Sequence, residues 1–178
     1  MHATDAGICL FGEIVTARYC QCMAGKVTVR GAKRSDIPEL FDLIREHAAY
    51  ERAAPPAHDV AERLSGLLFA PAPRIHALIA EVDGVVVGYA TASLEVETWQ
   101  AREFLHMDCL FLRDGARGSG VGGLLLNAVR QLAIDLGVDE VQWQTPEWNE
   151  GAVRFYDRAG AVKRAKYRFS LALDSEAV

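Results

Sequence analysis

The sequence predicts a single mixed α/β domain whose elements run in the order β-α-α-β-β-β-α-β-α-β. Its length of 178 residues corresponds to about one domain. Hydrophobic residues make up 51% of the chain and charged residues 24%, the composition of an ordinary globular protein. Segments with the period of a strand alternate with segments of helical period, which is typical of α/β folds. We expect residues 1–25 to be an N-terminal arm of uncertain structure and residues 26–178 to form the domain.

The first elements are a strand and two helices. Residues 26–33, KVTVRGAK, alternate as a strand does. Asp36 and Glu39 then fit a capping box, and Pro38 is tolerated in the first turn of a helix. The apolar residues that follow recur at helical spacing. A second helix is expected from residue 59 to residue 69, where the sequence APAPR ends it.

A hairpin, a strand and a long helix follow. Two β-rich runs flank Asp83 and Gly84, the strongest short hairpin signal. Residues 103–112, EFLHMDCLFL, predict a further strand. The stretch GVGGLLLNAVRQLAIDLG carries apolar residues on one helical face and ends at Gly137, a residue favoured just after a helix.

The last elements are a strand, a short helix and a final strand. Residues 138–145, VDEVQWQT, predict the first of these strands. Asn149 can cap the start of the short helix NEGAVRFYDRAG, and Gly160 can end it. Residues 161–173, AVKRAKYRFSLAL, are expected to close the chain as a strand.

Four glycines crowd into the stretch RGSGVGG, residues 117–123, directly before the long helix. Glycine permits a positive φ and lets a ligand approach the backbone closely. The N-terminus of a helix offers unpaired N–H groups and a partial positive charge, which together bind phosphate. Arg117 adds a fixed cation. The stretch therefore predicts a phosphate-binding loop.

Two common phosphate-binding patterns fit this loop poorly. A P-loop needs Lys and Ser/Thr after its second glycine, whereas Val121 and Gly122 follow Gly120. The dinucleotide pattern G-x-G-x-x-G is matched by Gly118, Gly120 and Gly123. However, only one βα unit and one short helix follow, which is too little for the usual doubly wound sheet.

A third pattern, R-x-x-G-x-G, fits fully at Arg117, Gly120 and Gly122. This loop resembles the acetyl-CoA pyrophosphate loop of the GCN5-related N-acetyltransferase (GNAT) superfamily, whose element order also matches residues 26–173. The stretch WNEGAVRFYDRAGA resembles the late helix of that superfamily. Together with LIREHAAYE and LHMDCLFL, it resembles the spermidine/spermine, diamine and thialysine N-acetyltransferase group.

The resemblance implies a GNAT-like mixed, mostly antiparallel sheet flanked by helices. It also implies direct acetyl transfer from acetyl-CoA to a primary amine of a small molecule: a diamine, a polyamine or an amino-acid side chain. This chemistry needs a base for the ammonium and an acid for the departing thiolate. By this resemblance, Tyr156 would be the acid. Asp108 stands where the group carries a glutamate base, on a strand that is bulged in the superfamily. Cys109 replaces a second acid of the polyamine enzymes, which favours a smaller amine or an amino-acid side chain.

The same resemblance implies the binding residues. The strand backbone at Leu110 and Leu112 would pair with the pantetheine arm as an added strand does. Asn149 would bond the pantetheine amides, cap its helix, or do both. The residues expected to bind acetyl-CoA are Leu110, Phe111, Leu112, Arg117, Gly118, Ser119, Gly120, Val121, Gly122, Asn149, Ala152 and Phe155. The residues expected to bind the cationic amine are Tyr50, Glu51 and Trp99.

Composition excludes some partners and leaves two other functions open. A net charge of -5 argues against nucleic acid, and no apolar run approaches the roughly 18 residues of a membrane helix. The four cysteines show no zinc spacing, so we expect free thiols, a cytoplasmic protein and no metal. A homodimer is implied by the resemblance. A non-catalytic acetyl-CoA or CoA sensor, and a nucleotide-binding oxidoreductase, remain as alternatives.

Overall fold

The computed structural model describes residues 25–171, which form two compact units that divide after Gln144. Apart from Gly25, the predicted N-terminal arm lies outside the described residues. The mixed α/β fold and its mostly antiparallel sheet confirm the predicted fold class.

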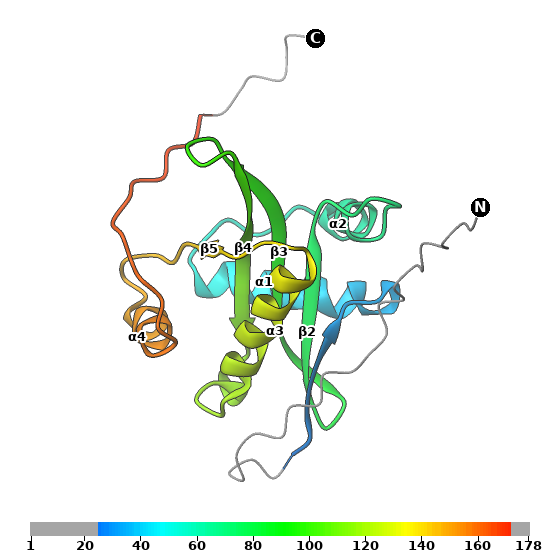
Figure 1. Ribbon diagram of the computed structural model, residues 1–178. Helices are drawn as coiled ribbons and strands as arrows, with labels where there is room; N and C mark the ends of the chain where they lie inside the picture. Colours follow the sequence, from blue (N-terminus) through cyan, green and yellow to red (C-terminus); the bar gives the residue numbers. More distant parts are fainter. Residues whose placement is uncertain (1–24, 172–178) are drawn as a thin grey trace, which may run out of the picture. The chain divides into compact units, whose positions relative to one another are not determined.

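The first unit is built on a five-stranded sheet in the order β1-β2-β3-β4-β5 (Figure 1). Successive strands are antiparallel, except that β5 runs parallel to β4. The predicted hairpin is present, with Asp83 and Gly84 at positive φ between β2 and β3. The strands are β1 (Val27–Gly31), β2 (His76–Val82), β3 (Val85–Glu97), β4 (Arg102–Leu112) and β5 (Val141–Trp143).

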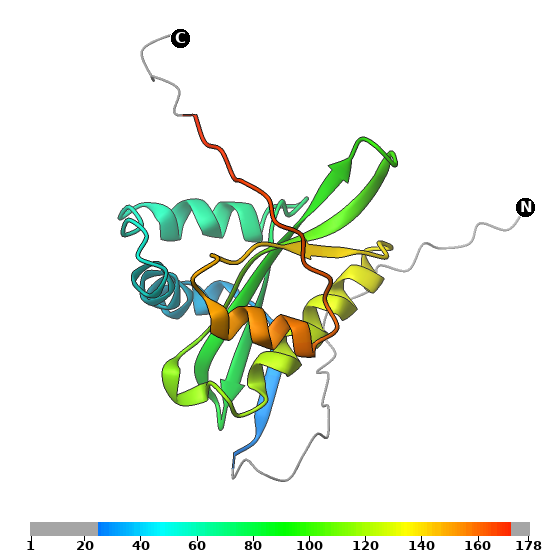
Figure 2. The same cartoon turned by 90° about the vertical axis from the view of Figure 1, so that its left-hand side faces the viewer.

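Helices cover both faces of this sheet (Figures 1 and 2). The 3-10 turn η1 (Arg34–Asp36), helix α1 (Ile37–Tyr50) and helix α2 (Val60–Leu68) lie on one face, and helix α3 (Val121–Asp135) lies on the other. A second 3-10 turn, η2 (Asp114–Ala116), connects β4 to α3. The core under α1 is fully apolar except for one phenol hydroxyl, and consists of Leu40, Leu43, Leu68, Ala77, Ile79, Tyr89 and Phe111.

The start of α1 differs in detail from the predicted capping box. Asp36 precedes the helix but makes no side-chain cap to it. Its carboxylate instead accepts hydrogen bonds from Arg30 Nη1 at 2.6 Å and from the backbone N–H of Lys33 at 2.6 Å. The Arg30 guanidinium therefore draws Asp36 toward β1, and the aspartate caps η1 rather than α1.

The second unit contains one helix, α4 (Glu150–Arg158). Asn149 caps it as predicted, since its side chain accepts a hydrogen bond from the Ala152 N–H at 3.1 Å. The predicted final strand is wrong for the described part of the segment, because residues 161–171 have no regular secondary structure. Val162 and Tyr167 are 88% and 91% exposed. Alternation alone does not make a strand, which also needs a partner for its backbone hydrogen bonds.

Candidate active site

A bulge in β4 sets the position of Asp108. Cys109 lies opposite Thr91 of β3, and Met107 lies opposite the next residue, Ala92. Asp108 is therefore the extra residue on β4, and its side chain is exposed. A bulge re-aims a side chain at a strand, and bulges are common beside active sites. The Asp108 carboxylate is thus presented to solvent from the middle of a partly buried strand.

One edge of β4 opens at the same position. β5 pairs with β4 only from Leu105 to Met107, and it ends at Trp143. Within the described residues, the stretch from Cys109 to Leu112 pairs with β3 alone. An open strand edge presents N–H and C=O groups to which an extended, amide-containing ligand can bind. The predicted pantetheine strand, Leu110 to Leu112, lies along this edge.

The glycine loop leads directly into α3. Gly118 and Gly120 have φ values of 74° and 89°, which glycine adopts most readily. Gly120 is the N-cap of the 15-residue helix, and the first turn of α3 holds no acidic residue. Ser119 ties the loop down by donating its hydroxyl hydrogen to the carbonyl of Ala116 at 2.6 Å. The first N–H groups of α3 and its dipole therefore face the loop without a competing carboxylate.

Arg117 connects this loop with a residue predicted to bind the amine. Its guanidinium lies 4.2 Å from the ring centroid of Tyr50 and 5.4 Å from that of Phe111. Nε donates a hydrogen bond to the Leu112 carbonyl at 2.9 Å, and Nη1 pairs with Asp114 at 2.8 Å. The cation is therefore held at the end of the open strand edge, beside the aromatic ring.

A polar group that the sequence analysis did not select lies between the two predicted carboxylates. His47 Nδ1 is 3.0 Å from the Tyr89 hydroxyl, and His47 Nε2 is 3.5 Å from Oε1 of Glu51. The Cys109 thiol lies near the Tyr89 hydroxyl and contributes to the raised pKa of that phenol. Cys109 Sγ in turn lies 3.5 Å from Oδ2 of Asp108. The one signal in the sequence that could have identified His47 is its position three residues after Ile44, on the apolar face of α1.

Burial keeps the middle of this group uncharged. Burial lowers the pKa of His47, an effect that Glu51 and Asp108 oppose and Arg117 reinforces. Burial also raises the pKa of the Cys109 thiol to about 11, with a further contribution from the Asp108 charge. The pKa of Tyr89 is raised as well, again chiefly by burial. Imidazole, thiol and phenol are therefore neutral at neutral pH.

The remaining predicted residues lie elsewhere. Trp99 is 92% exposed at the tip of the β3–β4 hairpin, which projects beyond the rest of the sheet (Figure 2). The six steps along β4 from Arg102 to Asp108 span roughly 20 Å at about 3.3 Å per residue. The structure thus brings Tyr50 and Glu51 to the β4 site but not Trp99.

Helix α4 carries the other predicted residues in the second unit. Tyr156 is half-buried, and its ring centroid is 5.0 Å from that of Phe155. Asn149 is buried, with 8% of its surface exposed. Ala152 is the residue whose N–H Asn149 caps. The assignment of these residues to the thioester stays a prediction.

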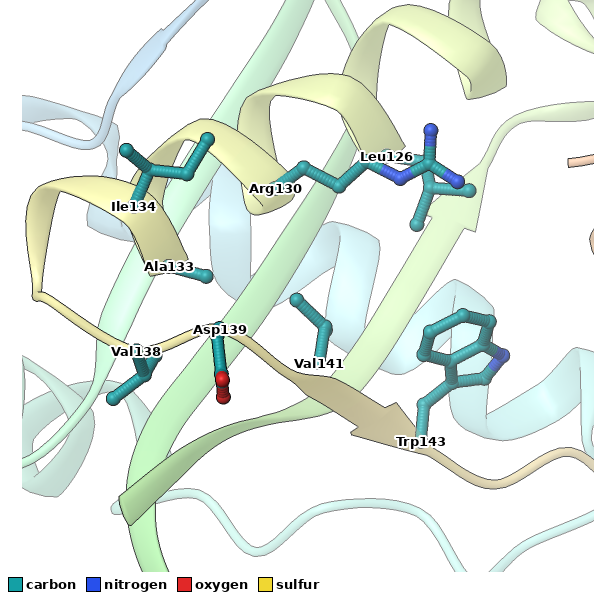
Figure 3. Close-up of a pocket in the computed structure, with 8 residues that line it drawn as sticks. All are labelled: Leu126, Arg130, Ala133, Ile134, Val138, Asp139, Val141 and Trp143. Carbon is teal, nitrogen blue, oxygen red and sulfur yellow. The ribbon is translucent and has the colours of Figure 1, made fainter. Parts of the chain in front are cut away.

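A separate pocket of about 330 Å³ lies between α3 and β5 (Figure 3). It contains none of the predicted site residues. Its lining consists of Leu126, Arg130, Ala133, Ile134, Val138, Asp139, Val141 and Trp143. Between residues 25 and 171, no cluster of three or more His, Cys, Asp or Glu side chains is arranged to hold a metal ion. No helix in that range is both long and apolar enough to cross a membrane.

Several known proteins are similar to this chain in sequence. Residues 37–161 match the sequence profile of the acetyltransferase (GNAT) family. A thialysine N-epsilon-acetyltransferase from Bos taurus is 29% identical over 143 residues, which are 76% of this chain and 84% of that protein. An L-ornithine N5-acetyltransferase from Arabidopsis thaliana is 35% identical over 86 residues, 48% of this chain and 38% of that protein.

Solved structures share the fold. An aminoglycoside N-acetyltransferase in complex with CoA superimposes with a TM-score of 0.69 at 19% identity, covering 86% of this chain and 99% of that chain. An integron cassette protein from the mobile metagenome of Cole Harbour Salt Marsh has a TM-score of 0.69 at 27% identity, covering 82% of this chain and 90% of that chain.

Proposed function

The chain belongs to the GNAT family of acetyltransferases and is an N-acetyltransferase, and from that premise we propose that it transfers an acetyl group directly from acetyl-CoA to the primary amine of a small molecule. The observation that carries the proposal is the open edge of β4, which runs from Asp108 toward the glycine loop at the N-terminus of α3.

The acetyl-CoA site uses two adjoining features of the first unit. The pantetheine arm pairs with the β4 edge at Leu110 to Leu112, where its amides meet strand N–H and C=O groups. The pyrophosphate binds at the start of α3, over Gly118 and Gly120, where N–H groups and the helix dipole favour negative charge. Arg117 supplies the cation.

Asp108 and Tyr156 supply the acid–base chemistry. Asp108 takes the proton of the ammonium, so that the amine nitrogen can attack the thioester carbonyl. An N–H group of the bulged strand near Leu110 polarises that carbonyl. The C–S bond then breaks, and the hydroxyl of Tyr156 gives its proton to the departing thiolate. The attached nitrogen loses its second proton to become a neutral amide, and this proton restores the Tyr156 hydroxyl. The resemblance of this helix to the late GNAT helix, and the phenol as a proton donor, support this role for Tyr156.

The acceptor is an amine on a small molecule of amino-acid size. Three relatives carry names of this kind: thialysine, L-ornithine and D-amino-acid N-acetyltransferases. Cys109, a thiol, stands next to Asp108 where a second carboxylate would suit a longer polycation. Tyr50 and Glu51 offer an aromatic face and a carboxylate, both of which favour a cationic head group.

The test is an acetylation assay with a panel of amines. The purified chain is incubated with acetyl-CoA and with thialysine, ornithine, lysine, diaminopropane or spermidine, and released CoA is measured. We expect the amino-acid side-chain amines to be acetylated faster than spermidine. Binding is measured in parallel by thermal shift with acetyl-CoA, CoA, NAD and ATP. Stabilisation by acetyl-CoA without turnover of any amine would favour the non-catalytic sensor instead.

A further inference from the structure

His47 contacts one of the residues proposed to bind the amine. Its Nε2 lies 3.5 Å from Oε1 of Glu51, one helical turn further along the chain at the end of α1. The Glu51 side chain is 35% exposed, whereas the His47 side chain is only 13% exposed. Glu51 can therefore meet a ligand from solvent, and His47 contacts the same carboxylate from the interior.

Three contacts fix the orientation of the His47 ring. It stacks on Phe111 with ring centroids 4.9 Å apart, and it meets the ring of Tyr89 edge-on at 5.9 Å. Nδ1 also forms a hydrogen bond of 3.0 Å with the Tyr89 hydroxyl. Tyr89 is 1% exposed, so this hydroxyl is held within the core. The imidazole is therefore kept with Nδ1 toward the phenol and Nε2 toward Glu51.

The partners of the imidazole decide which ring nitrogen carries the hydrogen. An ionised Glu51 carboxylate can only accept, so it favours a hydrogen on Nε2. Burial raises the pKa of Tyr89, so the phenol keeps its hydrogen and can donate it to Nδ1. Neutral His47 is therefore the tautomer with its hydrogen on Nε2. It offers an N–H group to Glu51 and leaves the charge of the carboxylate in place.

A proton on His47 changes what Glu51 offers to a ligand. The ionisable groups around the imidazole are Glu51 from α1, Tyr89 from β3, Asp108 from β4 and Arg117 from the loop before α3. Burial lowers the pKa of His47, so the ring is neutral at rest, and the two carboxylates stabilise the imidazolium once it forms. A cationic amine then meets a carboxylate that is already paired and a like charge beside it.

We propose that His47 is a positioning residue for the acceptor: its neutral form holds the Glu51 carboxylate in place for a cationic group, and its protonated form pairs with Glu51 and weakens amine binding. The proposal rests on the proposed function, in which Glu51 binds the amine. Ornithine carries two ammonium groups, and the site offers two carboxylates. Glu51 holds the ammonium that does not react, and Asp108 receives the proton of the one that does. His47 touches no substrate in this scheme and acts through Glu51.

The first experiment observes the His47 ring without catalysis. The chain with nitrogen-15-labelled histidine, bound to CoA, is titrated by nuclear magnetic resonance with and without saturating ornithine, and the spectrum of His47→Gln assigns the signals. We expect the neutral ring to carry its hydrogen on Nε2. Ornithine should lower the pKa of His47, because its ammonium offsets the Glu51 charge that stabilises the imidazolium. A hydrogen on Nδ1, or a pKa of His47 that stays constant when calorimetry shows ornithine bound, would overturn the proposal.

The second experiment measures the KM for ornithine against pH. His47→Gln keeps an N–H donor near Glu51 but takes up no proton, whereas His47→Leu removes the donor. At neutral pH the Gln variant should keep the wild-type KM, and the Leu variant should raise it about fivefold. One pH unit below the pKa of His47, the wild-type KM should exceed that of the Gln variant about tenfold, because most of the imidazole is protonated. The kcat and the KM for acetyl-CoA should change little.

The outcomes separate the role of His47 from the proposed function. Acetylation of ornithine with the same KM in wild type and both His47 variants at every pH leaves the proposed function standing and overturns the role of His47. A wild-type chain that neither binds nor acetylates ornithine overturns the proposed acceptor class and the role of His47 with it. His76→Gln is the matched control, because His76 is also a partly buried histidine but lies on β2, and it should keep the wild-type profile. Thermal unfolding of each variant identifies any effect that comes from misfolding.

Discussion

The guanidinium of Arg117 stacks on the ring of Tyr50 at 4.2 Å, so the loop proposed for the pyrophosphate and the side chain proposed for the amine are in direct contact. Arg117 comes from the loop before α3, and Tyr50 is the last residue of α1. Helix α1 and helix α3, which follows this loop, lie on opposite faces of the sheet (Figures 1 and 2). This contact at the end of β4 is therefore a direct physical link between the proposed sites for the two substrates.

This contact predicts that Tyr50 contributes to acetyl-CoA affinity as well as to amine affinity. A cation–π contact of this kind is worth about 0.5–1 kcal/mol at exposed sites. Tyr50→Leu should therefore raise the Kd for acetyl-CoA about two- to fivefold, and Tyr50→Phe should not. Isothermal titration without any amine present measures the effect. Phe69→Leu removes a similar stack, with Arg34 at 5.0 Å, far along the chain from the site, and should leave the Kd unchanged.

Gly120 is predicted to be essential for acetyl-CoA binding. Gly120→Asp places a carboxylate at the N-cap of α3, against the proposed pyrophosphate, and the Kd should rise at least tenfold, or about 1.4 kcal/mol. Because Gly120 has a φ of 89°, any side chain also strains the backbone. Gly137→Asp is the matched control, since Gly137 has a φ of 79° at the other end of α3. It should destabilise the fold similarly but leave the Kd alone. Equal binding by folded Gly120→Asp and wild type would contradict the loop assignment.

The sequence predicted those parts of the fold that depend on local signals. Two of the four loop glycines, Gly118 and Gly120, are at positive φ, as is Gly137, and Asp83-Gly84 forms the hairpin turn. The predictions of a final strand and of a helix cap at Asp36 were wrong, because both depend on partners elsewhere in the chain. The strand needs a neighbouring strand to pair with, and Asp36 pairs with Arg30 instead of capping α1. The family resemblance implied a bulge in β4, whereas its position at Asp108 is shown by the pairing of β4 with β3.

In the proposed site, too, residues marked by local sequence were predicted, and residues that depend on distant partners were missed. Arg117 and the glycines were found by their spacing within a single loop. His47 and Tyr89 were missed because they are 42 residues apart and meet only once α1 packs on β3. Tyr89 reaches Phe111 and Cys109 through the pairing of β3 with β4, a register that no single segment encodes. A histidine on the apolar face of a helix was the one sign that a polar partner would be buried there.

Asp108 is predicted to act in removing the ammonium proton. Asp108→Asn keeps the size of the side chain but removes its basicity, so kcat should fall strongly at neutral pH. The loss should shrink near pH 9, where more of an amine with a pKa near 10.4 is already neutral. The pH dependence of kcat/KM for the amine, measured for both proteins, checks this. A loss of the same size at every pH would instead make Asp108 a residue that positions the substrate.

Tyr156 is predicted to protonate the departing thiolate of CoA. Tyr156→Phe keeps the ring, its contact with Phe155 and helix α4, and deletes one hydroxyl. General acid catalysis contributes roughly 10²–10⁴-fold. A thiolate is already a fair leaving group, with a thiol pKa near 8.5 for cysteine, so we expect the low end of that range. KM for acetyl-CoA should change little, because the hydroxyl acts mainly in the transition state. The decisive measurement is single-turnover acetyl transfer, in which chemistry is observed directly. A Phe variant with an unchanged single-turnover rate removes Tyr156 from the mechanism and leaves the thiolate to depart without an acid from this chain's helix α4.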